Sequence, residues 1–400
     1  MPALVSSPFA LSQRAMALYA AVTAVSFSAT SSAPTPLYHV YQQTMGLSPL
    51  AVTIVFAAYA FAMLAAFLTV ARLSDYVGRR PMILAALALN AVALVLFIGA
   101  GSAAGLILAR VVQGIATGIA MTTLGATILD TDRKNGALYN SVTAFIGLML
   151  GSLTAGVLVA WAPLPQQLIY LVLLVVTVAE AALLFAAPET TAGRAGAFKA
   201  LIPHVSVPAA AVPVVIRLLP LNIAGWALGG FYLSLMPTLV TVATGIVSPF
   251  VGAAVVSALM LTAAIVVFAF RGLTPARVLT IAMSGLGLGI AVTLVGVALQ
   301  SAAVMIGGTV IAGIGFGSAY AGNLRTLLPL AGEHERAGLL AAYFVESYLA
   351  FAVPAIIAGL LAPMLGLIAT TYLYGGVLIG FVALSFLATR APRPARAMEI

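Results

Sequence analysis

The chain has 400 residues, of which 63% are apolar and only 6% carry a charge. Water-soluble domains contain roughly 25% charged residues, so this composition excludes a water-soluble enzyme, a nucleic-acid-binding protein and a disordered polypeptide. The formal net charge of +8 does not indicate a nucleic-acid partner here, because lysines and arginines gather in the cytoplasmic loops of membrane proteins. We therefore expect an integral membrane protein whose surface mostly contacts the lipid bilayer.

The sequence contains few groups that could bind a metal or a cofactor. It has no cysteine, and its three histidines, His39, His204 and His334, lie far apart in the chain. The two lysines, Lys134 and Lys199, do not belong to a G-x-x-x-x-G-K-S/T motif, which excludes ATP hydrolysis at a phosphate-binding loop of that type. We expect no metal site, no cofactor and no enzymatic activity.

Twelve apolar segments are long enough to cross a bilayer as α-helices, which takes about 20 residues each. In the first half of the chain these predicted spans cover residues 15–36, 50–71, 81–99, 103–128, 138–160 and 167–187. In the second half they cover residues 212–240, 249–270, 277–299, 302–328, 337–360 and 367–389. The leading segment is too long for a signal peptide and lacks a clear cleavage site, so we expect it to be the first span.

One long polar segment, residues 188–211, divides the chain into two parts. We expect an all-α membrane protein with a six-helix bundle over 1–187, a cytoplasmic linker, and a second six-helix bundle over 212–400. A shift of 203 residues aligns the two halves, and it places Arg133 on Arg336, Gly114 on Gly317 and Gly156 on Gly359. Parallel repeats of this kind are typical of one transporter architecture.

The basic residues predict the orientation of the chain in the membrane. Sixteen of the 17 lysines and arginines lie on one side of the predicted topology, in both tails, in the linker, and in or beside the loops that follow the even-numbered spans. The loops on the other side contain none. Because basic residues mark the cytoplasmic side, we expect both termini to be cytoplasmic and the protein to be a multi-pass protein of the inner cell membrane.

The loop between the second and third predicted spans reads ARLSDYVGRRP. Its Asp75 can pair with Arg79 and can lie at the positively polarised N-terminus of another helix, while Gly78 and Arg80 complete the turn. A cluster that breaks when the cytoplasmic side opens would act as a latch between conformational states. The alternative is a simple turn whose arginines only fix the topology.

The fourth span contains RVVQGIATG, which begins at Arg110 and includes Gln113. Arg110 is the one basic residue on the far side of the topology, and it lies roughly two turns inside the helix. A charge at that depth costs about 2.5 kcal/mol or more, so we expect Arg110 to face a hydrated cavity or an acid. The alternative is an arginine that extends to the outer membrane interface.

Two further segments complete the motifs. The fifth span contains GLMLGSLTAG, with Gly147, Gly151 and Gly156 at spacings that let helices approach closely. The first span ends in SAPTPLY, residues 32–38. Together with the loop and the fourth-span motif, these segments resemble the major facilitator superfamily, specifically its twelve-helix drug/proton antiporters. Ser152 stands where the antiporter pattern has a proline, so the resemblance in the fifth span is partial.

The resemblance covers essentially the whole chain and implies a major facilitator fold. It implies that the third, sixth, ninth and twelfth spans form an outer scaffold around a central cavity, and that Arg110 takes part in proton coupling or substrate binding. Intramembrane acids are candidates for proton transfer. Glu346, with Tyr343 on the same helix face, is therefore our predicted proton carrier, and Glu180, in the scaffold, is the second candidate or a structural acid.

The seventh span combines Asn222, Trp226 and Tyr232 with glycines. An amide and aromatic rings on a cavity-lining helix suit a flat, partly apolar substrate, so we count them with Gln113 and Tyr343 as candidate substrate-binding residues. Packing or anchoring at the membrane interface explains the aromatic residues equally well.

These observations predict a monomeric secondary active transporter that exports a small apolar or amphipathic compound, either a drug-like molecule or a metabolite, in exchange for protons. Its expected partners are a small-molecule substrate, protons and lipid. Proton-coupled uptake of a small metabolite is the alternative. A membrane sensor or an integral-membrane enzyme is a remote third possibility, because the sequence contains no appended soluble domain and no nucleophile or metal-binding cluster.

Overall fold

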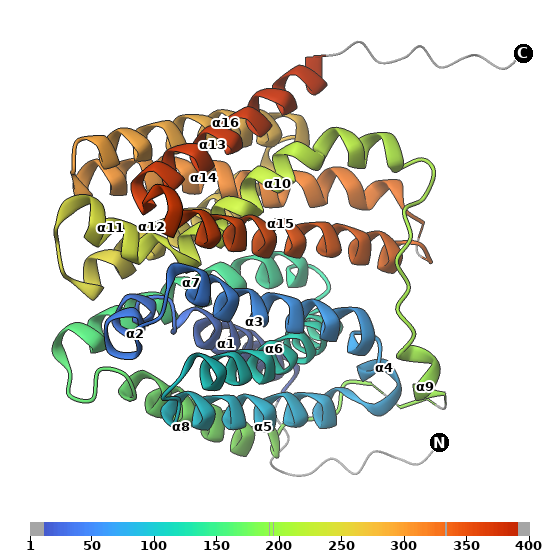
Figure 1. Cartoon of the computed structure of the whole chain (residues 1–400). Coiled ribbons are helices and arrows are strands. Elements are labelled where there is room, and N and C mark those ends of the chain that lie inside the picture. The colour runs from blue at the N-terminus through green and yellow to red at the C-terminus, as the bar shows by residue number, and fades with distance from the viewer. Residues whose placement is uncertain (1–11, 192, 195, 333, 391–400) are drawn as a thin grey trace, which may run out of the picture.

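The computed structural model describes residues 12–390 except positions 192, 195 and 333. All regular secondary structure in this part of the chain is helical (Figure 1). Both chain termini, whose cytoplasmic location the sequence predicts, lie outside the described residues.

The helices of the first half are α1 (Gln13–Ser32), α2 (Leu37–Met45), α3 (Pro49–Val70), α4 (Ser74–Val77), α5 (Arg79–Ile98), α6 (Ala103–Thr131), α7 (Gly136–Trp161) and α8 (Leu168–Leu184). The linker contains the short helix α9 (Ala197–Ala200). The second half contains α10 (Val212–Ser234), α11 (Met236–Thr244), α12 (Pro249–Ala269), α13 (Pro275–Ala298), α14 (Ala302–Leu327), α15 (Arg336–Leu365) and α16 (Leu367–Arg390).

Eleven helical stretches of the described chain are long and apolar enough to cross a membrane, and α8, with 17 residues, is a shorter apolar helix at the sixth predicted span. The protein is therefore an all-helical, multi-pass membrane protein, as its composition predicts. Two predicted spans are not continuous helices. In the first, predicted over 15–36, α1 ends at Ser32, and a second helix, α2, begins after Pro34 and Pro36, beyond the predicted end; the seventh is divided into α10 and α11 just before Pro237. Proline cannot donate the helical hydrogen bond and its ring clashes with the preceding turn, which explains both breaks.

The two halves lie side by side and face each other along two helix pairs. In Figure 1 the first half lies below and the second half above, and the linker connects them at the right. We call this side, with α4, α9 and the arginine-bearing loops, the basic end, and the side with α2 and α11 the opposite end. The pair α3 and α15 and the pair α7 and α12 join the halves. Phe56 and Phe351, with ring centroids 4.8 Å apart, belong to the first of these interfaces.

Glycines that the internal repeat aligns make equivalent contacts. Within the halves, a Cβ atom added to Gly114 would lie 2.5 Å from the Tyr59 carbonyl oxygen of α3, and one added to Gly317 would lie 2.7 Å from the Ala263 carbonyl oxygen of α12. Each of these two glycines therefore lets the fourth helix of its half pack directly on the second. Such close packing of helix backbones is characteristic of small residues in membrane proteins.

Between the halves, the aligned glycines Gly156 and Gly359 bring the backbones together at the opposite end. Gly156 of α7 lies directly against Ala253 of α12, and Gly359 of α15 lies directly against Thr53 of α3. Hydrogen bonds reinforce this closure. Gln42 of α2 accepts one from the Thr238 hydroxyl of α11 at 2.9 Å. The two halves are thus sealed to each other at the opposite end.

We expect Gly359→Val to weaken this seal, because the new side chain would overlap Thr53. Overpacking of a tight contact costs about 1–3 kcal/mol, so the midpoint of thermal unfolding of the purified protein in detergent should fall. Gly376→Val is the matched control, since Gly376 is an exposed helical glycine with no neighbouring atom in reach of an added Cβ. Equal midpoints for the two variants would contradict this role of Gly359.

Candidate functional site

A cavity of about 570 Å³ lies between the two halves, and helices of both halves line it. It reaches the basic end, where Leu129 and Ala137 are exposed. Ten aromatic residues dominate its wall: Phe56, Tyr59, Phe67, Phe145, Trp226, Phe316, Tyr320, Phe344, Tyr348 and Phe351. A largely apolar pocket of this size with a few polar groups is typical of a small-molecule site.

Arg110 of α6 lies in the wall of this cavity, and its side chain is almost completely buried. Its guanidinium donates hydrogen bonds to the Ser31 carbonyl at 2.8 Å, the Gln113 side-chain oxygen at 2.6 Å and the Tyr38 hydroxyl at 2.7 Å. It also lies over the ring of Tyr59, 4.8 Å from the centroid. The sequence predicts that Arg110 faces either a hydrated cavity or an acid, and the structure shows it at the cavity with neutral partners.

The break between α1 and α2 provides the acceptors for this cluster. Pro34 has no N–H to donate to the Thr30 carbonyl, which instead accepts a hydrogen bond from the Gln113 amide at 2.9 Å. The Thr35 N–H turns to the Ser32 carbonyl, so the Ser31 carbonyl is free for Arg110. The proline motif at the end of the first span and the arginine motif of the fourth are therefore two parts of one hydrogen-bond network.

A second polar cluster lies in the other half, around Glu346 of α15. The Asn222 amide of α10 donates hydrogen bonds to the Glu346 carboxylate and, at 2.9 Å, to the Ser347 hydroxyl. Asn323 of α14 donates to the Asn222 side-chain oxygen at 2.9 Å. One carboxylate oxygen of Glu346 and the side-chain oxygen of Asn323 are buried and have no hydrogen-bond partner within the described part of the chain. Asn323 is a residue that sequence reasoning missed, although an amide inside an apolar helix is a usable signal.

The predicted substrate-binding residues are divided between the cavity and the protein interior. Trp226 lines the cavity and directs its indole N–H toward the Tyr343 hydroxyl, 3.5 Å away. Gln113, Asn222 and Tyr343 lie behind the wall and hold other residues in place. Tyr232 is fully packed between helices, with its hydroxyl 2.9 Å from that of Thr309.

Glu180 of α8 is also separate from the cavity lining. It is buried where α8 packs on α1, and its carboxylate oxygens have no hydrogen-bond partner among the described residues. The Tyr19 hydroxyl of α1 donates to the Glu180 backbone carbonyl at 3.0 Å. Glu180 is thus buried beside α1 and outside the cavity lining.

The glycines of the fifth-span motif bring α7 directly onto α1. Gly147 and Gly151 lie against the α1 backbone between Val25 and Ala29. The Ser32 hydroxyl donates across this contact to the Leu148 carbonyl at 2.8 Å. Ser152, which stands in place of the antiporter proline, continues the helix and is completely buried. This geometry matches the close helix approach that the glycine spacing predicts.

The loop at the basic end forms a network of charged groups centred on Arg79. Its guanidinium pairs with the Asp75 carboxylate at 2.6 Å and with that of Asp130, at the end of α6, at 3.2 Å. Arg79 is buried, whereas half of the Asp75 side chain is exposed. Gly78, at a φ of +110°, makes the turn into α5. Both ion pairs of the described residues therefore use the same arginine.

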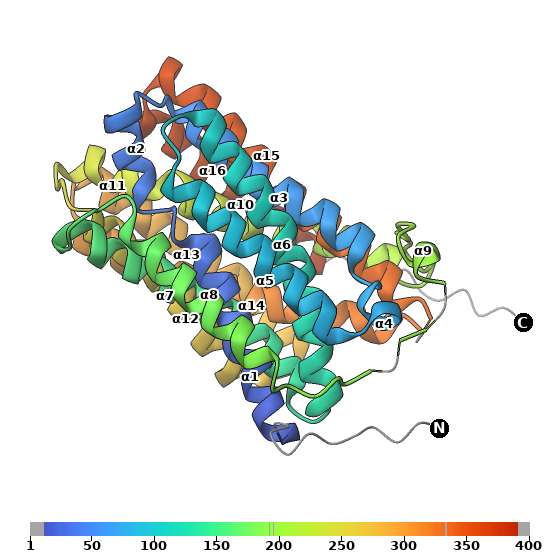
Figure 2. The same cartoon turned by 90° about the horizontal axis from the view of Figure 1, so that it is seen from below.

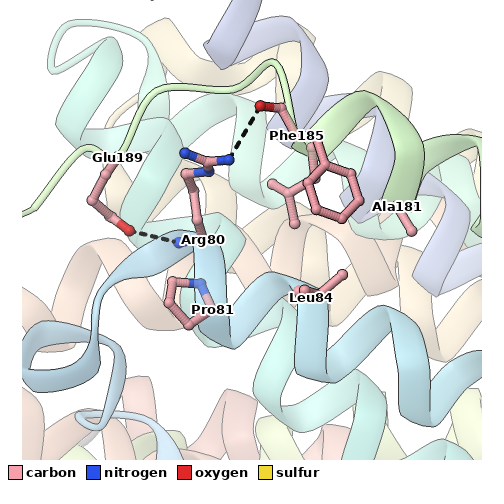
Figure 3. A pocket seen from close by; sticks show the side chains of 7 residues that line it. Arg80, Pro81, Leu84, Ala181, Phe185 and Glu189 are labelled. Carbon is pink, nitrogen blue, oxygen red and sulfur yellow. Dashed lines mark hydrogen bonds between the residues drawn. The ribbon is translucent and has the colours of Figure 1, made fainter. Parts of the chain in front are cut away.

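At the N-terminus of α5 the acid is Glu189, whereas Asp75 lies in the first turn of the short helix α4. The two carboxylate oxygens of Glu189 accept hydrogen bonds from the backbone N–H groups of Arg79, at 2.8 Å, and Arg80, at 3.0 Å, at the start of α5. The Arg80 guanidinium in turn donates to the Phe185 carbonyl at 3.2 Å (Figure 3). The beginning of the linker is thus tied to the loop, where a carboxylate satisfies free N–H groups and the helix dipole.

Beside this tie is a second cavity of about 310 Å³, between α5 and α8. These two helices lie next to each other on the outside of the first half (Figure 2). Arg80, Glu189 and the apolar side chains around them line this space, and it is remote from the aromatic residues of the central cavity. The central cavity is therefore the candidate substrate site.

Known proteins share this fold. The chain resembles crystal structures of the nucleoside transporter NupG (11% identity, 94% of this chain and 100% of that chain covered, TM-score 0.73) and of the human organic anion transporter MFSD10 (17%, 95% and 100%, 0.64). A third is a bacterial homologue of the human lysosomal transporter Spinster, in an inward-facing and unoccupied conformation (15%, 96% and 98%, 0.72). No curated protein sequence matches the chain.

The sequence pattern of the Major Facilitator Superfamily matches residues 18–277, which is more than half of the chain. The helical architecture, the two facing halves and the cavity between them agree with this match. The chain therefore belongs to the major facilitator superfamily, a family of membrane transporters for small molecules and not of enzymes.

Proposed function

We propose that the protein is a proton-coupled secondary transporter that exports a small amphipathic compound by alternating access. A cavity of about 570 Å³ with aromatic walls suits an organic molecule of moderate size. The printed names of two proteins with the same fold, a nucleoside transporter and an organic anion transporter, refer to small organic substrates. The antiporter-like glycines of α7 and the proline motif before α2 support exchange with protons.

The positive-inside rule supports an orientation with the basic end in the cytoplasm. In that orientation the cavity is open to the cytoplasm and the sealed opposite end faces outward. An inward-facing conformation of this kind is also the one named for the bacterial Spinster homologue. Export would then begin with binding from the cytoplasm, followed by closure of the basic end and separation of the halves at the opposite end.

The observation that carries proton coupling is the environment of Glu346. This acid lies inside an apolar helix, and among the described residues its hydrogen-bond donor is the neutral amide of Asn222 rather than a cation. A proton can therefore change the local charge without breaking an ion pair. Asn222 and Trp226 are one turn apart on α10, and Trp226 lines the cavity. Protonation of Glu346 can thus affect the substrate site. Exchange of substrate for protons requires that this protonation weakens substrate binding.

The charged network at the basic end is intact in this conformation, although the cavity reaches the same end. The proposed latch would therefore be released at another step of the transport cycle than the opening of the cytoplasmic side. Arg79 connects the α3–α5 loop to the end of α6 through Asp130, and Glu189 connects the same loop to the linker. Because all these segments lie at the mouth through which substrate would enter, their contacts are suited to change during the transport cycle. Arg110 would set the electrostatic potential at the inner part of the cavity.

For proton coupling we expect Glu346→Gln to abolish transport driven by a pH gradient while exchange of substrate across the membrane survives. Glutamine keeps the size and hydrogen-bonding capacity of the protonated acid but cannot release a proton. Proteoliposomes with an internal pH dye, screened with a panel of dyes and aromatic metabolites, would measure both activities.

Glu180→Gln is the matched control, because that acid lies in the scaffold. If the Glu180 variant lost coupling and the Glu346 variant kept it, the proton path would run through α8 and our assignment would be wrong. A flux that follows a sodium gradient and ignores pH would exclude the proton as the coupling ion.

For the latch we expect Glu189→Gln to slow turnover with near-normal expression, as we also expect for Asp75→Asn. The neutral amide cannot offer two oxygens to the α5 N-terminus, and a charge at that position is worth about 0.3–1 kcal/mol. Initial transport rates in proteoliposomes check this. Glu335→Gln serves as control, since Glu335 is an exposed acid at the same end. Unchanged turnover in both latch variants would mean that the motif is a simple turn whose arginines only fix the topology.

The orientation of the chain in the membrane can be tested with single introduced cysteines, because the sequence contains none of its own. In whole cells, a membrane-impermeant maleimide should label Gln43→Cys at the exposed opposite end but not Arg194→Cys in the linker. Both positions should react after the cells are permeabilised. Labelling of Arg194→Cys alone in intact cells would invert the orientation.

A further inference from the structure

The electrostatics of the central cavity indicate the charge of its ligand. Among the described residues that line this cavity, Arg110 is the one charged side chain. The acids Glu346 and Glu180 do not belong to the lining, and both ion pairs of the described chain involve Arg79. Asp75 and Asp130 lie at the basic end, outside the lining. The cavity therefore carries a single positive charge with no counter-charge in its wall.

The partners of Arg110 orient this charge without cancelling it. A carbonyl, an amide oxygen and a hydroxyl accept its hydrogen bonds, and each of them is neutral. Its Nε–H group is buried and has no hydrogen-bond partner among the residues that the structure describes. A buried cation without an anionic partner is unfavourable, and this cost would be relieved when an anionic group enters the cavity. A cationic ligand would instead be repelled.

The remainder of the wall defines the rest of the ligand. Aromatic rings from both halves, such as Tyr59, Trp226 and Phe316, surround the space next to Arg110. Such surfaces suit a flat apolar body and offer few hydrogen bonds. The ligand that fits all these features has one anionic group and one aromatic or otherwise flat apolar part.

We propose that the substrate is an amphipathic organic monoanion, an aromatic carboxylate in the simplest case, whose negative charge is bound by Arg110. This inference rests on the proposed function, because it takes the central cavity to be the substrate site. An inside-negative membrane potential drives an anion outward and a proton inward. The loss of negative charge when Glu346 is protonated would by itself favour an anion, so the weakening of binding that exchange requires would come through the contact of Glu346 with Asn222 and the position of Trp226 on the same helix. Exchange of one monoanion for one proton would move charge across the membrane, whereas uptake of the anion with one proton would not.

The test is a binding measurement on the purified full-length protein that needs no pH gradient. The chain has two tryptophans, so Trp161→Phe leaves Trp226 in the cavity wall as the single reporter. Quenching of its fluorescence is titrated with three nitroaromatic probes of the same shape and different charge: 4-nitrobenzoate, 4-nitrobenzamide and 4-nitrobenzyltrimethylammonium. We expect the carboxylate to bind at least 10-fold more tightly than the amide, and the cation to bind most weakly.

Substitutions then assign this preference to one residue. Arg110→Gln should bring the dissociation constants of the carboxylate and the amide to within about 2-fold, and Arg110→Lys, which retains the charge, should keep part of the preference. Arg72→Gln, an exposed arginine outside the cavity, is the control and should leave the preference unchanged. Equal binding of carboxylate and amide by the single-tryptophan protein would overturn the inference, as would tighter binding of the cation, and neither result depends on whether Arg110→Gln folds.

The outcomes also separate this inference from the proposed function. A clear carboxylate preference together with pH-independent flux in proteoliposomes would support the anion site and contradict proton coupling. Conversely, pH-driven flux of neutral or cationic compounds, with no preference for the carboxylate, would support coupling and overturn the anion site. Solid-supported membrane recordings with 4-nitrobenzoate should show a substrate-induced current if an anion is exchanged for a proton.

Discussion

The break in the first transmembrane span is the feature on which the first half of the site depends. Two prolines in close succession remove helical donors and leave the carbonyls of Thr30 and Ser31 without their usual partners. Gln113 and Arg110 bind these two carbonyls from α6. These two side chains thus satisfy the carbonyls that the break leaves unpaired, and the break in turn fixes the cation Arg110 in the wall of the central cavity. A continuous first helix would offer Arg110 no backbone acceptor at this depth.

The two halves share an architecture, and each contains an intramembrane charge whose hydrogen-bond partners are neutral. The first half holds Arg110 and the second holds Glu346, and in each case neutral amide, hydroxyl or carbonyl groups provide the hydrogen bonds. Within residues 12–390, as far as the structure describes them, neither charge belongs to an ion pair. Trp226 belongs to the helix that holds Glu346 through Asn222 and also lines the cavity that contains Arg110. The geometry therefore offers a short route between the two charges.

At the basic end the charged groups instead form ion pairs that hold segments of the chain together. Arg79 joins Asp75 and Asp130, while Glu189 closes the N-terminus of α5 and ties the linker to the same loop. The contacts that hold the halves together at the opposite end are of a different kind. There the halves meet through glycines and a few hydrogen bonds, as at Gly359 against Thr53. In this conformation the contacts at both ends are formed.

The sequence by itself determined the membrane location, the approximate number and limits of the spans and the family, and it singled out Arg110 and Glu346 as candidate site residues. All of these follow from hydrophobic length and from the high cost of a charge in lipid, which are properties of local sequence. Only the tertiary structure decided the partners. The pairing of Arg110 with the freed Ser31 carbonyl joins residues 79 positions apart, and that of Asn222 with Glu346 joins residues 124 apart. The capping of α5 by Glu189 likewise joins segments that are distant in the sequence. In a bundle whose spans are all apolar, long-range packing of the helices decides which of the few polar groups come into contact.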